Sequence, residues 1–153
     1  MGMPGDRRLD RPPSDRYVAA PDADATATVP AGSTIRAVGA GVAAAAAWAV
    51  LSVVLGGGLA ISAGLLVLAA AGGRVIAVAT TWGGGGSLQA GTRIALVVGL
   101  VIAGFVLGQL GIWAYGRAEG GVMAPLDYLL TTFGIVVPLQ LVVALAVGWW
   151  TAR

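Results

Sequence analysis

The sequence predicts an all-α integral membrane protein with four transmembrane helices, arranged as two antiparallel hairpins behind a disordered N-terminal tail. Of its 153 residues, 58% are hydrophobic and only 10% are charged, whereas soluble domains carry about 25% charged residues. The apolar residues form long runs, and about 20 such residues in a helix cross a hydrocarbon core of about 30 Å. Glycine-rich or charged breaks separate these runs.

Residues 1–33 are predicted to form a disordered cytoplasmic tail. They hold five of the seven prolines, together with four arginines and five aspartates, and almost no bulky aliphatic side chains. Such a segment buries too little apolar surface to offset the entropy lost on ordering, so solvated disorder is favoured over a partner-binding tail. The segment also lacks the apolar core of a secretory signal peptide. Residues 34–153 are predicted to form the transmembrane domain.

The first two spans are predicted at about residues 36–55 and 59–81. From Arg36 to Gly73 the chain is almost wholly apolar, and one helix of that length would run about 57 Å, roughly twice the hydrocarbon thickness. The chain must therefore reverse. We place the turn at Gly56–Gly58, because glycine accommodates the positive φ that a tight reversal needs. A turn this short makes the two helices antiparallel neighbours.

The third and fourth spans are predicted at about residues 94–115 and 126–150. The break before the third, WGGGGSLQAGTR at residues 82–93, has the composition of a flexible linker and lacks the lysine of a phosphate-binding glycine loop. The break before the fourth, YGRAEGGVMAPLDY, contains three charges, paired glycines and a proline. Within the fourth span, Pro138 predicts a helix kink because it lacks a backbone N–H; a structural kink is favoured over a transport hinge.

Arginines near the span ends predict that both termini lie in the cytoplasm. With that threading one arginine, Arg117, falls outside, and four fall on or near the cytoplasmic side, where basic residues are enriched: Arg36, Arg74, Arg93 and Arg153. Tryptophan and tyrosine gather near both predicted interfaces, as their amphipathic rings prefer. The expected location is the plasma membrane, or inner membrane, as a multi-pass protein. The pattern LGIWAYGRAEGGVMAPLDYLL, followed by FGIVVPLQLVVALAVGWW, resembles the end of a small bacterial membrane protein.

A lone arginine, Arg74, lies inside the otherwise apolar second span. Counting along the helix places it roughly 7 Å from the cytoplasmic edge of the hydrocarbon core. Its side chain can extend toward the headgroups, so a role as a membrane anchor is favoured. The alternative is an interhelical hydrogen bond to Gln140, which is predicted at nearly the same depth. Gln109 is the third large polar residue expected within the membrane.

Small residues at four-residue spacing predict where the helices approach one another, because lipid tails are as apolar as leucine and close contact must supply the attraction. The candidates are Gly39, Ala43 and Ala47 in the first span, the pairs Ala60–Gly64 and Ala69–Gly73 in the second, and Gly104 and Gly108 in the third, with Gly111 one turn further on. Packing within the chain is favoured over contact with another protein.

Little in the sequence indicates catalysis. The chain has no cysteine and no histidine, which excludes disulfides, thiol chemistry and thiolate or imidazole metal sites. No cofactor or metal is predicted, and a net charge of +2 without a basic stripe argues against nucleic acid. The one cluster of functional groups is expected on the outer face: Tyr115, Arg117, Glu119, Asp127 and Tyr128. A hydrated loop with interfacial tyrosines is favoured there over acid–base chemistry or anion binding.

The function that the sequence favours is a structural or accessory subunit in the lipid bilayer, packing against other membrane proteins or against copies of itself. The alternative is a component of a transporter or channel, in which a small solute passes near Gln109, Pro138 and Gln140. A polar pathway normally needs more intramembrane polar groups than these spans offer. A membrane enzyme is the third choice.

Overall fold

The computed structural model describes residues 32–59, 62–121 and 123–153, and this part of the chain contains helices and short connections without a strand. The elements are α2 (Gly32–Ser52), η1 (Val53–Gly58), α3 (Ser62–Gly84), α4 (Ala90–Ala118), α5 (Pro125–Phe133) and α6 (Val136–Ala152). Residues 1–31 of the predicted tail, and Ala60, lie outside the described residues.

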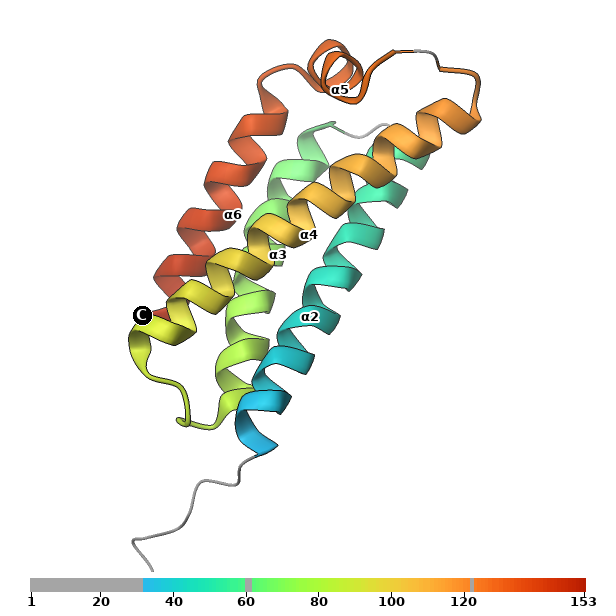
Figure 1. Ribbon diagram of the computed structural model, residues 1–153. Helices are drawn as coiled ribbons and strands as arrows, with labels where there is room; N and C mark the ends of the chain where they lie inside the picture. The colour runs from blue at the N-terminus through green and yellow to red at the C-terminus, as the bar shows by residue number, and fades with distance from the viewer. Residues whose placement is uncertain (1–31, 60–61, 122) are drawn as a thin grey trace, which may run out of the picture.

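Four helices lie side by side, and the short helix α5 lies across one end of them (Figure 1). Around the group, α2 contacts α3, α3 contacts α6, α6 contacts α4, and α4 contacts α2. Large apolar side chains also cover the outside of every long helix, for example Val42, Val67, Val106 and Val142. A helix that is hydrophobic all round is typical of a membrane span. Three helices are long and apolar enough to cross a membrane, or four if α5 and α6 form one broken span.

The three glycines predicted to form the first turn are helical instead. Gly56–Gly58 belong to η1, a π-helical continuation of α2, and the combined apolar helix runs over Thr34–Gly58. The Leu59 N–H donates to the Val54 carbonyl at 3.1 Å, a bond that spans five residues. A Cβ on Gly56 would lie 2.7 Å from the Ile112 side chain of α4. This glycine therefore allows a close helix contact, and the chain reverses only after Gly58.

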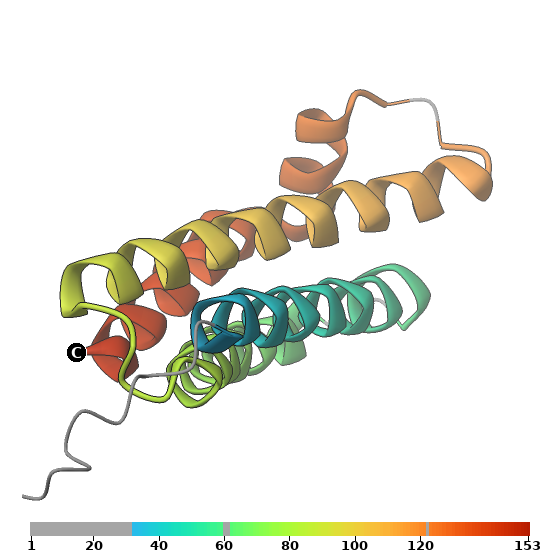
Figure 2. The same ribbon diagram turned by 60° about the horizontal axis from the view of Figure 1, so that its bottom comes forward.

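The predicted fourth span is two helices, α5 and α6, bent by 90° at a short break (Figure 2). Gly134 ends α5 with a positive φ of 57°, which favours glycine, and its N–H donates to the Leu130 carbonyl at 3.0 Å. Pro138 is the third residue of α6, where backbone N–H groups have no partner within the helix in any case. The Gly134 carbonyl accepts from Val137 instead. The bend is therefore at Gly134 and not at Pro138.

The face of α2 that packs against the other helices differs from the prediction. Gly39, Ala43 and Ala47 are all exposed, and nothing lies within 4 Å of the position that a Cβ on Gly39 would take. The buried face consists of Ala37, Gly41, Ala45, Trp48, Ala49 and Ser52. Because α2 carries small residues on every side, their spacing alone does not select the packing face.

On one side, α2 packs against α3 in opposite residue order. A Cβ on Gly83 would lie 2.7 Å from the Arg36 carbonyl, and one on Gly72 would lie 2.6 Å from the Trp48 ring. Residue numbers therefore rise along α2 as they fall along α3. Close contact through glycine is the means by which apolar helices associate where the hydrophobic effect is absent.

On its other side, α2 packs against the glycines of α4. A Cβ on Gly104 would lie 3.2 Å from the Ala45 carbonyl, and one on Gly108 would lie 3.2 Å from the Ser52 Cβ. Gly111 lies against the Val53 side chain. The G-x-x-x-G motif of α4 therefore faces α2 of the same chain.

The backbones of α3 and α6 approach each other closely at Gly73. A Cβ there would overlap the Ala144 carbonyl, and a Cβ on Gly148 would lie 3.3 Å from the Gly73 carbonyl. Ile76 and Val101, both fully buried, belong to the core cluster that contains Ala144. The contact leaves room only for hydrogen at residue 73.

We expect Gly73→Ala to lower the free energy of unfolding by about 1–3 kcal/mol, the usual cost of inserting a carbon into a filled contact. Gly39→Ala is the matched control, because the added methyl group has nothing within 4 Å. Unfolding of the purified full chain in mixed micelles, followed by circular dichroism, measures both changes. Equal effects of the two variants would contradict the α3–α6 contact.

Candidate functional site

A hydrogen-bonded pair of glutamines lies buried between α4 and α6. The Gln109 Nε2 donates to the Gln140 Oε1 at 2.9 Å, and the two residues are 7% and 4% exposed. One turn or less away, Ile112 and Val137 are buried in an apolar cluster. The pair satisfies one donor and one acceptor, but the Gln109 Oε1 is buried without a partner among the described residues.

This pair excludes the alternative role predicted for Arg74. Gln140 points to α4, whereas Arg74 is exposed on the outer side of α3. Gly73 lies against Ala144, so Gln140, four residues before Ala144 on α6, lies about one turn, or about 6 Å, from that level. Arg74 and Gln140 also face different directions, so no hydrogen bond joins them.

Arg74 borders a hollow on the outside of the molecule, between α3 and α6. The hollow has a volume of about 270 Å³ and is lined otherwise by Ala146, Val147, Trp150 and Thr151. Trp150 and Thr151 belong to the last turn of α6. The arginine therefore lies beside the end of a neighbouring helix and an exposed indole ring.

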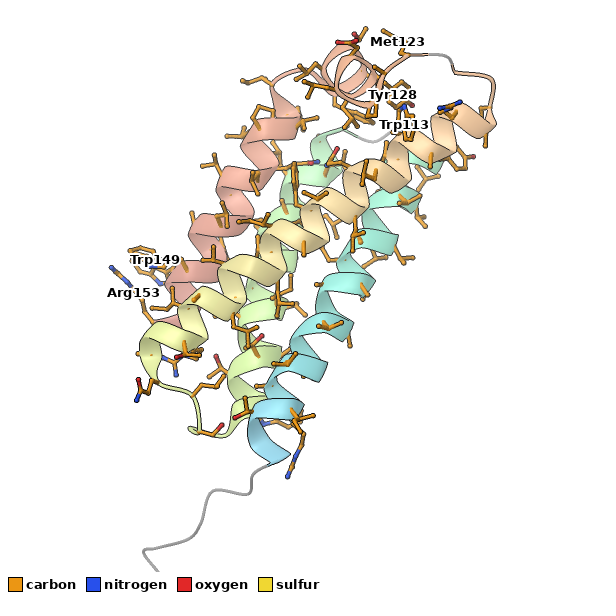
Figure 3. The ribbon with its side chains drawn as sticks, viewed as in Figure 1. Trp113, Met123, Tyr128, Trp149 and Arg153 are labelled. Atoms are coloured by element: carbon orange, nitrogen blue, oxygen red, sulfur yellow. The ribbon has the colours of Figure 1, made fainter. Side chains whose placement is uncertain are left out.

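Three further arginines lie at the end of the molecule where α3 and α6 finish, which we call the basic end: Arg36, Arg93 and Arg153. The Arg93 Nε donates to the Ala152 carbonyl at 2.8 Å, and its Nη2 donates to the Arg153 carbonyl at 3.2 Å. The Arg153 guanidinium lies 3.5 Å from the centre of the Trp149 ring (Figure 3). A cation near the last carbonyls of a helix stabilises that helix end. Arg93 therefore links the start of α4 to the end of α6, a contact that was not predicted from the sequence.

The predicted outer-face cluster lies at the opposite end, where α4 finishes and α5 crosses (Figure 3). The Arg117 guanidinium lies 5.2 Å from the Trp113 ring centre, and the Trp113 indole N–H donates to the Met123 carbonyl at 3.0 Å. A Cβ on Gly116 would lie 2.7 Å from the Tyr128 ring.

Tyr115, Glu119 and Asp127 complete this cluster and are exposed. The Glu119 backbone N–H donates to the Tyr115 carbonyl at 3.2 Å and so helps to end α4. The Trp113–Met123 bond joins the connecting loop to α4, and Tyr128 joins α5 to α4, whereas Arg117 contacts a ring of its own helix. These contacts fit a structural helix end. A tryptophan N–H usually finds a hydrogen-bond partner when it is buried. This preference is the signal in the sequence that could have pointed to the Trp113–Met123 bond. Among the described residues, no group of acidic side chains is placed to hold a metal ion.

No family model, curated protein or solved structure matches the chain. Three features of the described residues therefore support the functional proposals. They are the glutamine pair between α4 and α6, the outward small residues of α2, and the hollow beside Arg74.

A double-mutant cycle tests the glutamine pair. We expect Gln109→Leu and Gln140→Leu to be coupled by about 0.6 kcal/mol or more in the free energy of unfolding, the average for interhelical hydrogen bonds in membranes. Removal of one glutamine leaves the other buried and unpaired, whereas removal of both does not. In the control cycle, Arg74→Leu with Gln140→Leu should be additive within about 0.5 kcal/mol. A larger coupling in the control cycle would contradict the observed pairing.

Proposed function

We propose that the chain is a multi-pass plasma-membrane protein whose spans form two antiparallel hairpins, with both termini in the cytoplasm. The outward apolar surface of α2, α3, α4 and α6 supports insertion in lipid. Helix α6 has 17 residues and is therefore about 25 Å long, which spans most of a hydrocarbon core of about 30 Å. On this proposal α5 lies in the interface, with Leu129 and Phe133 buried against the other helices.

The distribution of charge supports the direction of threading. The basic end carries Arg36, Arg93 and Arg153, whereas both acidic residues after residue 32, Glu119 and Asp127, belong to the opposite end. Arginines are enriched on the cytoplasmic side of membrane proteins. With the basic end in the cytoplasm, the α3–α4 loop is cytoplasmic and the α4–α5 loop is external.

Within the membrane, we propose a structural or accessory role in which the chain packs against another membrane protein or a second copy. The observation that carries this proposal is the outward stripe formed by Gly39, Ala43 and Ala47 on α2, all exposed. Small residues spaced in this way let a second helix come close enough for strong van der Waals contact. The glycines Gly104 and Gly108 are buried against α2 and so do not serve as the partner face.

A similar stripe on α4 supports the same role. Ala95, Gly99 and Ala103 are exposed at four-residue spacing, and nothing lies within 4 Å of a Cβ position on Gly99. Because α4 and α2 are neighbours, both outward stripes belong to one half of the helix group. We therefore expect a partner to contact this half.

A transporter or channel component is the second candidate. Two observations favour it: the broken span formed by α5 and α6, and the Gln109 Oε1, which has no partner in the part of the chain that the structure describes. Interrupted helices and buried polar groups mark many transport sites. Against it, the amides bond to each other, and the hollow beside Arg74 opens on the outside of the helix group. The accessory role therefore remains the first proposal.

We expect Gly39→Leu combined with Ala43→Leu to release a stoichiometric partner that co-purifies with the wild-type chain in gentle detergent. Added leucine side chains would hold the partner helix away, whereas folding should persist because both positions face outward. Quantitative mass spectrometry of chemically cross-linked, purified complexes measures the release.

The matched control is Val67→Leu with Val142→Leu, which adds volume at exposed positions of α3 and α6. This control should retain the partner. Equal retention by both double variants, or a wild-type chain that purifies as a lone monomer, would contradict the accessory role. Solute flux in proteoliposomes that Gln140→Leu abolishes would favour the transport candidate.

The absence of cysteine allows a clean test of threading. Gln89→Cys, in the exposed α3–α4 loop, should react with a membrane-impermeant maleimide only after the cells are permeabilised. Ala124→Cys, exposed just before α5, should react in intact cells. The reverse pattern would contradict the direction of threading, and equal reaction at both sites in intact cells would contradict the arrangement as hairpins.

A further inference from the structure

The hollow beside Arg74 continues toward the basic end as a groove between α3 and α6. A second hollow, also of about 270 Å³, is lined by Val78, Thr81, Trp82 and Thr151. Thr151 lines both hollows, so they adjoin along the same helix pair. We call the two hollows together the α3–α6 groove; Arg74 lies at one end of it and Trp82 at the other.

The guanidinium of Arg74 has no anionic partner within the described chain. The acidic residues after residue 32 are Glu119 and Asp127, and both belong to the opposite end of the molecule. Gln140, the alternative partner predicted from the sequence, bonds to Gln109. A guanidinium offers five N–H donors in a planar fork, and this fork matches the oxygen atoms of a phosphate or carboxylate.

The rest of the groove offers groups suited to a lipid headgroup. Trp82 and Trp150 are 86% and 75% exposed, and indole rings prefer the boundary between hydrocarbon and headgroups. Thr151 donates its hydroxyl to the Val147 carbonyl at 2.8 Å, and the Thr81 hydroxyl oxygen is buried. The side-chain donors that the groove offers to a phosphate are therefore the Arg74 guanidinium and the two indole N–H groups.

The groove leads from the depth of Arg74 toward the headgroup level of the proposed bilayer. Arg74 and Trp82 are eight residues apart on α3, or about 12 Å along the axis. With Trp82 at the interface, Arg74 begins within the hydrocarbon and its long side chain covers part of the distance to the headgroups. The arginines of the basic end add positive charge at this level, which favours an anionic lipid over a zwitterionic one.

We propose that the α3–α6 groove binds the phosphate of an anionic phospholipid of the cytoplasmic leaflet, with the Arg74 guanidinium as its main ligand. The acyl chains extend from the groove along the apolar outer surface of α3 and α6. This proposal rests on the membrane insertion stated under the proposed function, but it is independent of the accessory role.

Titration of the full chain in detergent with phosphatidylglycerol, followed by native mass spectrometry, tests the proposal. We expect Arg74→Gln to weaken phosphatidylglycerol binding about tenfold, because charge-assisted hydrogen bonds contribute more than neutral ones. Arg36→Gln removes one positive charge at the basic end, on α2, and should weaken binding less than twofold. Phosphatidylcholine should bind the wild-type chain more weakly than phosphatidylglycerol does.

A second variant keeps the arginine and fills the groove. Ala146→Trp places a large side chain at an exposed position of the hollow beside Arg74, and we expect it to weaken phosphatidylglycerol binding as well. Arg74→Lys should retain most of the binding, since the positive charge remains. This pair separates the shape of the groove from its charge, because both variants keep the positive charge and only Ala146→Trp fills the hollow.

Four outcomes would overturn the proposal. Equal weakening by Arg74→Gln and Arg36→Gln would show diffuse charge attraction without a site. Undiminished binding by Ala146→Trp would place the lipid elsewhere. Displacement of the lipid by millimolar inorganic phosphate would assign the groove to a soluble anion. A dimer that Arg74→Gln dissociates, without a change in lipid binding, would assign it to a second copy of the chain.

The maleimide test of threading reports insertion without any bound lipid, so its failure is distinguishable from failure here. A chain that threads as proposed but whose phosphatidylglycerol binding is insensitive to Arg74→Gln loses only the groove proposal. Reaction at both cysteine positions in intact cells removes the membrane arrangement on which the groove depends.

Discussion

The helix group depends on two adjacent glycines in α3. Gly72 leaves space for the Trp48 ring of α2, and Gly73 leaves space for the Ala144 backbone of α6. Successive residues of an α-helix point about 100° apart. Gly72 and Gly73 therefore allow α2 and α6 to approach α3 from two directions at the same level. In lipid no hydrophobic effect draws helices together, and close van der Waals contact must do so. A side chain at either position would push one neighbour away from α3 at this level.

The approximate positions of the three longest helices were predictable from the sequence, because each is a continuous apolar run of the length that a bilayer span needs. The predicted fourth span is instead two helices. The turns were less predictable. A glycine run was expected to end the first helix, yet Gly56 and Gly57 stay helical and face Ile112 and Tyr115 of α4. In the fourth span, a kink was predicted at Pro138, but the bend is at Gly134, which has a positive φ. Local propensity did not show which glycine is used for packing and which for reversal.

The faces of the helices were not predictable for a related reason. Counting 1.5 Å per residue gives the depth of a side chain, but not its direction around the helix axis relative to helices elsewhere in the chain. By depth Gln140 suits Arg74, whereas in the structure it meets Gln109, 31 residues away in sequence. The small residues of α2 raise the same difficulty, because Gly39 and Gly41 are equally small and only Gly41 is buried. The direction in which a side chain faces relative to the other helices is known only once all four helices are packed together.

The position of the Arg74 side chain follows from the helix contact at Gly73. Because Gly73 brings the backbone of α3 against Ala144, the next residue emerges at the edge of that contact, beside Val147 and Trp150. A snorkelling arginine needs no hollow, since extension along the helix already reduces the cost of about 2.5–3.5 kcal/mol at the bilayer centre. A hollow with an exposed indole ring beside the guanidinium is the feature that an anchor does not require. That difference favours a bound phosphate over simple anchoring.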